Sequence, residues 1–228
     1  MPYRNCGRHQ DNYPCLIATV DGPKKCTGVL IAPKHVLITS GCLTRNVRWT
    51  SIGAQKFNAT NDGEKFKVKA MLTHPQSTTY TNDFMVLEME KASAVTPVAL
   101  AATDGSDNKA GERAQYLGWR HIQETETTSY SRGEKLQSSE VKILSNEQCA
   151  TMINIDKSNL CAGGNANEDS CQGSFGSPLI VEKANQDVVV GLTSWIFDCN
   201  LSNTPSIFAR VAGAREWIES ATKSTCFV

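Results

Sequence analysis

Short runs of apolar and β-branched residues recur along nearly the whole chain, and residues that favour turns separate them. Such runs occupy residues 27–32, 35–39, 66–72, 85–89, 178–181, 188–193 and 207–211. This length and spacing are typical of an antiparallel barrel or sandwich rather than of alternating strands and helices. Residues 212–222 predict a helix, because Trp217, Ile218 and Ala221 can share one face. The pattern therefore predicts an all-β protein with a C-terminal α-helix.

Charge and length narrow the classes of protein that fit this pattern. The chain has 228 residues, with 23 basic and 23 acidic side chains and a formal net charge of zero. Neutrality argues against a nucleic-acid-binding protein, which needs a basic face. No apolar run approaches the roughly 18–20 residues of a membrane-spanning helix. We therefore expect neither a nucleic-acid nor a membrane partner. The length suits one large β domain, or two small lobes separated by the polar connection near residues 102–110.

Nine cysteines are many for a chain of 24.9 kDa. A zinc site is the alternative to disulfides, but the sequence has no C-x-x-C pair and its histidines number four. Disulfides indicate a secreted, extracellular protein, since they persist in oxidising compartments. The triplets Asn58-Ala59-Thr60 and Asn200-Leu201-Ser202 match the acceptor motif for N-glycosylation, which agrees with secretion. We expect no metal and no cofactor.

A series of short motifs occurs in a fixed order over nearly the full length of the chain. They are the segment from Cys26 to Cys42, Asn82-Asp83-Phe84-Met85-Val86-Leu87, Gly118-Trp119, Leu160-Cys161-Ala162-Gly163-Gly164, Asp169-Ser170-Cys171-Gln172-Gly173, Ser194-Trp195, Pro205, Arg210-Val211 and Trp217-Ile218. In this order they resemble the chymotrypsin/trypsin family of serine proteases. The resemblance implies one trypsin-like domain of two packed six-stranded antiparallel β-barrels. Their lobes would span about 1–102 and 103–211, with the helix at about 212–222.

The resemblance also identifies the positions at which the family carries its catalytic triad. In that triad a serine attacks the substrate carbonyl, a histidine takes its proton and an aspartate orients the imidazole. The aspartate matches Asp83, but Gly41 stands at the histidine position and Phe175 at the serine position. Ser174 replaces the aspartate that pairs with the freed N-terminus in active members, so we expect a chain that cannot be activated. The resemblance therefore implies a pseudo-protease, not an enzyme, with a vestigial triad at positions 41, 83 and 175.

The family's specificity pocket is altered as well. Asp169 matches the position that attracts Lys or Arg in trypsin-like enzymes, and Ser194 and Trp195 follow the family's pattern. Ile196 and Ser206 replace smaller residues and add volume where a substrate side chain would enter. Two interpretations stay open: Asp169 binds a cation, or it is a solvated carboxylate beside a partly filled pocket.

The resemblance implies three disulfides that the family shares. They join Cys26 to Cys42, Cys149 to Cys161 and Cys171 to Cys199. Each such bridge contributes about 2–4 kcal/mol by restricting the unfolded chain. Three cysteines remain, and the sequence leaves open the pairing of Cys6, Cys15 and Cys226.

Within the family, several phrases are similar to secreted oomycete glucanase inhibitor proteins, which are inactive trypsin-like chains that bind host endo-β-1,3-glucanases. The phrases are residues 29–34, 49–53 and 62–75. This resemblance implies a monomeric pathogen effector that binds a secreted plant endoglucanase in the host apoplast. The contact would then have an apolar floor made by Phe175, Trp195, Ile196 and Phe197. The alternative is an accessory cofactor or regulator in an extracellular proteolytic cascade, a role that other inactive protease homologues have.

Overall fold

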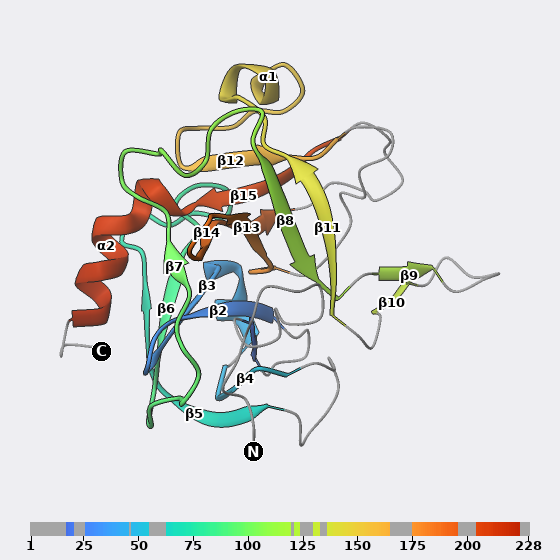
Figure 1. The fold of residues 1–228 in the computed structure, drawn as a ribbon. Helices are drawn as coiled ribbons and strands as arrows, with labels where there is room; N and C mark the ends of the chain where they lie inside the picture. Colours follow the sequence, from blue (N-terminus) through green and yellow to red (C-terminus); the bar gives the residue numbers. More distant parts are fainter. Residues whose placement is uncertain are drawn as a thin grey trace.

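Strands dominate the structure, as the apolar pattern predicts (Figure 1). The computed structural model describes residues 17–20, 26–45, 47–54, 63–119, 121–123, 130–132, 136–164, 175–195 and 204–223. Two curled, mostly antiparallel sheets form the framework of this part of the chain, and a helix follows them. The predicted fold class, an all-β double barrel with a C-terminal helix, is confirmed.

The first sheet is a closed barrel with the strand order β1-β2-β3-β6-β5-β4. Its strands are β1 (Ile17–Val20), β2 (Cys26–Ala32), β3 (His35–Ile38), β4 (Trp49–Ile52), β5 (Glu64–Thr73) and β6 (Met85–Met89). Alternation decides which side chains face the interior: along β5, Lys65 and Lys67 are exposed, whereas Phe66 and Val68 pack against the barrel core. That core includes Leu30, Val36, Ile38, Ile52, Met85 and Leu87.

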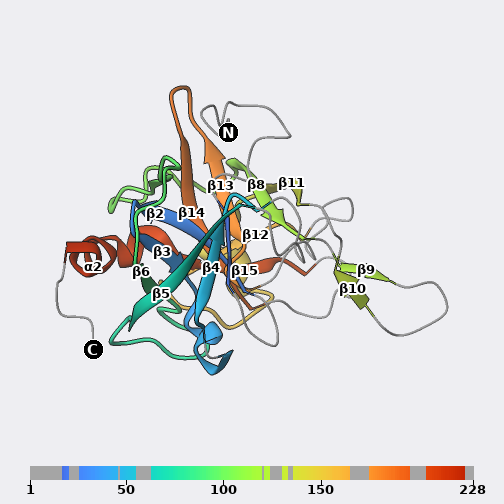
Figure 2. The ribbon, with the colours of Figure 1, turned by 90° about the horizontal axis from the view of Figure 1, so that it is seen from below.

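Among the described residues, the second sheet has seven strands, in the order β11-β8-β13-β14-β15-β12, with β7 paired to β14. They are β7 (Ala99–Leu100), β8 (Arg113–Gly118), β11 (Gln137–Lys142), β12 (Asn159–Ala162), β13 (Pro178–Glu182), β14 (Asp187–Trp195) and β15 (Ser206–Arg210). An isolated bridge between Ile143 and Ala162 joins the two ends of this sheet, so it also curls towards a barrel. Two further strands, β9 (His121–Gln123) and β10 (Tyr130–Arg132), form a small sheet that stands apart from both barrels (Figures 1 and 2).

The contact between the barrels is apolar. One continuous core cluster includes Val29 and Val86 of the first barrel together with Tyr116 and Leu192 of the second. Within it the rings of Tyr116 and Phe208 meet edge to face, with centroids 5.1 Å apart. The loops that flank this contact are therefore held on a rigid base.

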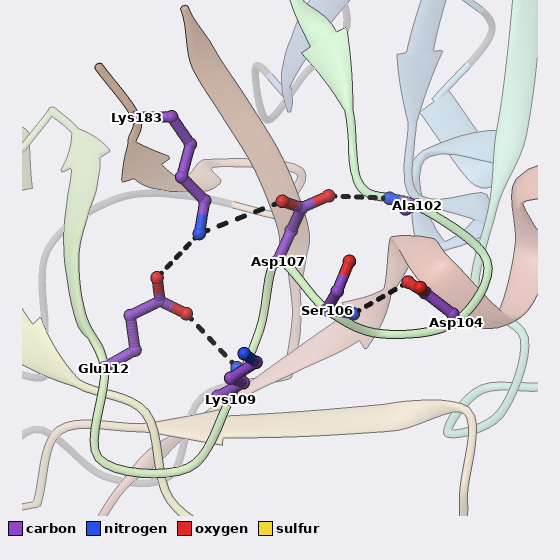
Figure 3. A network of polar contacts seen from close by, with 7 residues as sticks. All are labelled: Ala102, Asp104, Ser106, Asp107, Lys109, Glu112 and Lys183. Carbon is purple, nitrogen blue, oxygen red and sulfur yellow. Dashed lines mark hydrogen bonds and ion pairs between the residues drawn. The ribbon is translucent and has the colours of Figure 1, made fainter.

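A polar network orders the connection between the two sheets (Figure 3). The Asp107 carboxylate accepts a hydrogen bond from the Ala102 amide at 2.9 Å. Lys183, on the second sheet's side, pairs with Glu112 at 2.7 Å and with Asp107 at 3.8 Å. These pairs are partly exposed, so each contributes at most about 1 kcal/mol, and their role is to fix the path of the connection.

The predicted C-terminal helix is confirmed as α2 (Val211–Lys223). Its buried side chains belong to Val211, Ala212, Ala214, Ile218 and Ala221. Arg215 fastens the helix to the connection by donating to the carbonyls of Leu100 and Ala101 at 2.6 and 3.0 Å. No helix in the described part of the chain has the length and apolar character needed to cross a membrane.

A second, short helix, α1 (Asn146–Ala150), is not among the predicted elements. Ser145 caps it: the Gln148 amide donates to the Ser145 hydroxyl at 3.1 Å, and the Ser145 amide donates to Gln148 Oε1 at 3.0 Å. This reciprocal pair is a capping box, and Ser-x-x-Gln at 145–148 is its sequence signal.

Two of the three implied disulfides lie among the described residues, and both are formed. They are Cys26–Cys42 and Cys149–Cys161. The first ties β2 to the 3-10 helix Ser40–Arg45 and so fixes the segment that carries Gly41. Cys171 and Cys199 lie outside the described residues.

Candidate functional site

The Asp83 carboxyl group is buried just before β6. Asn82 adopts a left-handed backbone conformation with φ 47°, which asparagine tolerates better than most residues. The Asn82 amide donates to the Ser158 hydroxyl of the second barrel at 3.0 Å, and the Phe84 amide donates to the Asn82 carbonyl at 2.8 Å. This backbone turn directs the Asp83 side chain inward, and the residue is 2% exposed.

Hydroxyl and backbone N–H groups donate hydrogen bonds to the Asp83 carboxylate. The Ser40 hydroxyl and the Gly41 amide donate to Oδ1 at 2.5 and 3.2 Å, and the Ser194 hydroxyl donates to Oδ2 at 2.6 Å. Because the Ser40 hydrogen points to Asp83, Ser77 must be the donor in the contact of 2.7 Å between the two serine hydroxyls. No basic side chain in the described part of the chain forms an ion pair with Asp83. Within the described ranges, only neutral groups donate to this carboxylate.

Burial is the main influence on this group's ionisation. It raises the pKa of Asp83 above the usual value, because a charged carboxylate loses its hydration. The hydrogen bonds from Ser194, Ser40 and Gly41 favour the charged form and offset part of this rise. The site thus holds a buried carboxyl group that hydroxyl and backbone N–H groups surround, with no countercharge from the described residues.

Open space lies at Gly41, next to the groups that donate to Asp83. It lies in the 3-10 helix Ser40–Arg45, is exposed, and precedes the bridged Cys42. A Cβ atom added to Gly41 would meet no atom within 4 Å. The position could accommodate a side chain, but the sequence provides none.

Phe175 is held against both barrels by its backbone. Its carbonyl accepts from the Thr27 amide of β2 at 2.9 Å, and the following amide of Gly176 donates to the Thr193 carbonyl of β14 at 2.8 Å. The phenyl ring is 36% exposed. Through the hydrogen bond of the next residue, Gly176, the structure holds Phe175 close to the part of β14 that carries Ser194. The phenyl ring itself offers neither a nucleophile nor a proton acceptor.

The described histidines have other contacts. His74 Nδ1 accepts from the Gln76 amide at 3.2 Å, its ring lies 4.8 Å from the Trp217 ring, and burial lowers its pKa. His35 lies on β3 opposite Glu88, and burial lowers its pKa too. No group of His, Cys, Asp and Glu within the described ranges is arranged to hold a metal ion.

The structure places only part of the implied specificity pocket. Trp195 ends β14, and Ser206 begins β15 and is 2% exposed. The other predicted site, disulfide and glycosylation positions lie outside the described residues, namely Cys6, Cys15, Asn58, Asp169, Cys171, Ser174, Ile196, Phe197, Cys199, Asn200 and Cys226.

Two residues at this site are not among the sequence-predicted ones. Ser40 supplies the shortest hydrogen bond to Asp83, and Tyr80 packs edge to face on Trp195 with ring centroids 5.1 Å apart. The only sequence signal for Ser40 is its place beside the vacant position 41. Tyr80 carries no signal, because its contact joins segments that are far apart in the chain.

Replacing Asp83 with Asn is expected to remove a pH dependence of stability. Because burial raises the folded-state pKa, the native chain binds more protons than the unfolded chain between the unfolded and folded pKa values. The contribution of this carboxyl group is thus fully present below the unfolded pKa and is lost as pH rises through the folded pKa. The free energy of unfolding of Asp83→Asn, minus that of the wild type, should therefore rise with pH across this window.

Urea unfolding of both proteins over a pH series measures this difference. Asp104 provides a control of opposite sign, since the Ser106 amide donates to its Oδ1 at 2.9 Å and lowers the pKa of this exposed carboxyl (Figure 3). For Asp104→Asn the same difference should rise as pH falls. A difference for Asp83→Asn that falls with pH would contradict the burial argument.

The sequence of the chain matches a known protein family. The trypsin family model matches residues 5–218. The chain is 40% identical over 213 residues to glucanase inhibitor protein 3 of Phytophthora infestans, which covers 90% of this chain and 81% of that relative. It is 36% identical over 212 residues to glucanase inhibitor protein 1 of Phytophthora infestans, with the same coverage. It is 34% identical over 221 residues to glucanase inhibitor protein 3 of Phytophthora sojae, covering 91% and 82% of the two chains. The chain belongs to the trypsin family.

Proposed function

We propose that this chain is a non-proteolytic member of the trypsin family that acts by binding another protein. Its target, in this proposal, is an endo-β-1,3-glucanase that a host plant secretes into the apoplast, and binding inhibits that enzyme. One observation carries the non-proteolytic part: the Asp83 carboxylate accepts hydrogen bonds from Ser40, Gly41 and Ser194, and no described histidine contacts it.

This arrangement lacks the proton relay that peptide hydrolysis needs. In the family's mechanism, one ring nitrogen of the base takes the nucleophile's proton while the other donates to the aspartate. Position 41 carries no side chain, and Phe175 has no atom that can attack a carbonyl. Without a base and a nucleophile, residual catalysis falls to about 10³–10⁴-fold over water. The surface of such a chain is then available for binding alone.

Two observations support a protein partner and its identity. The three relatives compared above, at 34–40% identity, are named as glucanase inhibitors. Beside the vestigial triad the chain also exposes large apolar side chains, 56% of Tyr80 and 36% of Phe175. Exposed groups of this kind mark interaction surfaces. A few such anchors supply most of the affinity in a protein interface of the usual ~1,600 Å².

A titration of a purified plant endo-β-1,3-glucanase with this chain tests the proposal. We expect hydrolysis of laminarin to fall with added chain and to level off at a fixed molar ratio, while a β-1,4-endoglucanase is unaffected. Undiminished laminarin hydrolysis would overturn the glucanase target. A pull-down from apoplastic fluid that recovers proteases in place of glucanases would favour the role in a proteolytic cascade.

Phe175→Ala should weaken binding to the glucanase by about tenfold or more, because it removes an exposed aromatic anchor beside the vestigial triad. Trp49→Ala is the matched control: Trp49 is also aromatic and is 40% exposed, but it lies on β4, which pairs with β1 and β5. Surface plasmon resonance measures both dissociation constants. Equal losses in the two variants would argue against a contact at Phe175.

A further inference from the structure

A cavity of about 720 Å³ opens where the loop before Asp83 meets the second barrel. Thr78, Tyr80 and Thr81 form one wall, residues 154–156 and Asn159 form the other, and Trp195 at the end of β14 also lines the cavity. The volume falls within the range of about 300–1,000 Å³ that small-molecule sites occupy. Tyr80 lines this cavity and is also one of the exposed side chains that the proposed glucanase contact uses.

Hydrogen bonds between the two walls fix their relative position. The Asn159 side-chain amide donates to the Tyr80 carbonyl at 2.9 Å, and the Asn82 amide donates to the Ser158 hydroxyl at 3.0 Å. The Asp156 amide in turn donates to Asn159 Oδ1 at 3.0 Å. Because the cavity is already formed without a ligand, binding costs little entropy for ordering the two walls.

Aromatic rings form the apolar part of the lining. The Tyr80 and Trp195 rings meet at 64° with centroids 5.1 Å apart, so they form a corner. Tyr80 is 56% exposed, and Ile155 beside it is partly buried. A solvent-facing aromatic corner offers faces on which the C–H groups of a flat ring can pack.

The polar part of the lining suits hydroxyl groups. Asp156 Oδ1 accepts from the Ser158 amide and hydroxyl at 2.7 and 2.5 Å, while no hydrogen bond from the described residues reaches Oδ2. The exposed Asn154 amide likewise makes no hydrogen bond within the described part of the chain. A carboxylate oxygen accepts from a hydroxyl, and an amide both donates and accepts.

The charges of the described lining argue against an anionic or a cationic ligand. Among the described residues that line the cavity there is no Lys or Arg, so they offer an anion no countercharge. Asp156 is the one charged residue in the described part of the lining, and the exposed Lys157 that follows it offsets the attraction for a cation. An aromatic corner with amide and carboxylate groups at its edge matches a pyranose ring, whose apolar faces are rimmed by hydroxyls. We propose that this cavity binds a neutral oligosaccharide.

Titration of the isotopically labelled chain with laminarihexaose, a β-1,3-glucan fragment, tests this proposal without any glucanase present. We expect the Trp195 indole N–H resonance to shift and to saturate. Tyr80→Ala should weaken binding by about tenfold or more, since it removes one ring of the corner. Asn154→Ala should weaken it severalfold, and Trp49→Ala, which changes an exposed aromatic residue of β4, should leave it unchanged.

A parallel titration with cellohexaose, a β-1,4-linked fragment, identifies the class of glucan that binds. The proposal is supported if either hexaose binds saturably and Tyr80→Ala weakens that binding. Three results would overturn it. They are no saturable shift with either hexaose, binding that Tyr80→Ala leaves intact, and a response of the same indole to a lysine-rich peptide but to no sugar. Urea unfolding of Tyr80→Ala verifies that the variant is folded, which its exposed position favours.

Discussion

The double variant Gly41→His, Phe175→Ser is expected to cleave no peptide substrate measurably. It returns an imidazole and a hydroxyl to positions 41 and 175, but Asp83 Oδ1 already accepts hydrogen bonds from the Ser40 hydroxyl and the Gly41 amide. Ser40 donates to Asp83 Oδ1 at 2.5 Å. Such a charge-assisted hydrogen bond is roughly twice as strong as a neutral one. A new imidazole must displace this hydroxyl before its N–H can reach the carboxylate, so most molecules hold the imidazole in unproductive orientations.

A second obstacle concerns the oxyanion hole. By resemblance to the family, Ser174 stands where active members carry the aspartate that shapes this hole by pairing with the freed N-terminus. Losing one oxyanion-hole donor costs about 10²–10³ in kcat. Restoring the triad alone therefore leaves transition-state stabilisation incomplete. The losses from the misoriented imidazole and from the oxyanion hole multiply, so we expect the double variant's kcat/KM to stay within about tenfold of the wild-type background.

Hydrolysis of chromogenic peptides with Lys or Arg before the scissile bond, with trypsin assayed alongside, measures this expectation. A fluorophosphonate probe reports whether any serine is activated. Adding Ser40→Ala to the double variant is the diagnostic step, because it frees Asp83 Oδ1, and we expect the triple variant to react faster with the probe than the double variant. Robust cleavage by the double variant itself would show that the Ser40 hydroxyl yields easily and that the oxyanion hole is intact.

The strand pattern and the family motifs predict most of the scaffold, for identifiable physical reasons. Alternation along β5 forces Phe66 and Val68 inward, and that signal survives in a single sequence. Cys26 and Cys42 are close in the chain, and the family resemblance supplies their pairing. The C-terminal helix follows from its 3.6-residue period. Local or repeated signals of this kind need no knowledge of tertiary contacts.

The composition of the site is less accessible from sequence, because long-range contacts create it. Ser40 and Ser194 are 154 positions apart by number, yet both donate to Asp83. The corner of Tyr80 and Trp195 likewise joins the two barrels. A serine or tyrosine in a loop has many alternative roles, so the residue type alone does not indicate such a contact. The fate of Asp169 and Ile196 remains a prediction from the family resemblance.

Gly176→Ala is expected to destabilise the fold by about 3–5 kcal/mol, which combines left-handed strain with overpacking. Gly176 has φ 82°, and a Cβ atom there would lie 1.9 Å from the Thr27 carbonyl oxygen and 2.9 Å from its carbonyl carbon. Both are backbone atoms of β2, so no side chain can rotate to make room. The hydrogen bond from the Thr27 amide to the Phe175 carbonyl, at 2.9 Å, joins β2 to the same turn before β13. A methyl group therefore forces the two barrels apart at the point where Phe175 is anchored.

Two other glycines separate this effect from the general cost of changing glycine. A Cβ on Gly213 or on Gly41 would meet no atom within 4 Å. Gly213→Ala lies in α2 and should stabilise the chain by about 0.5–1 kcal/mol, because alanine has the higher helix propensity. Gly41→Ala should stay within about 0.5 kcal/mol of the wild type, as exposed substitutions usually do. Thermal unfolding ranks the three: at about 2–4 °C per kcal/mol, Gly176→Ala should melt roughly 10 °C lower. A melting temperature for Gly176→Ala equal to that of Gly41→Ala would mean that the barrels separate at this contact without cost, and that the anchoring of Phe175 is looser than the hydrogen bond to β2 indicates.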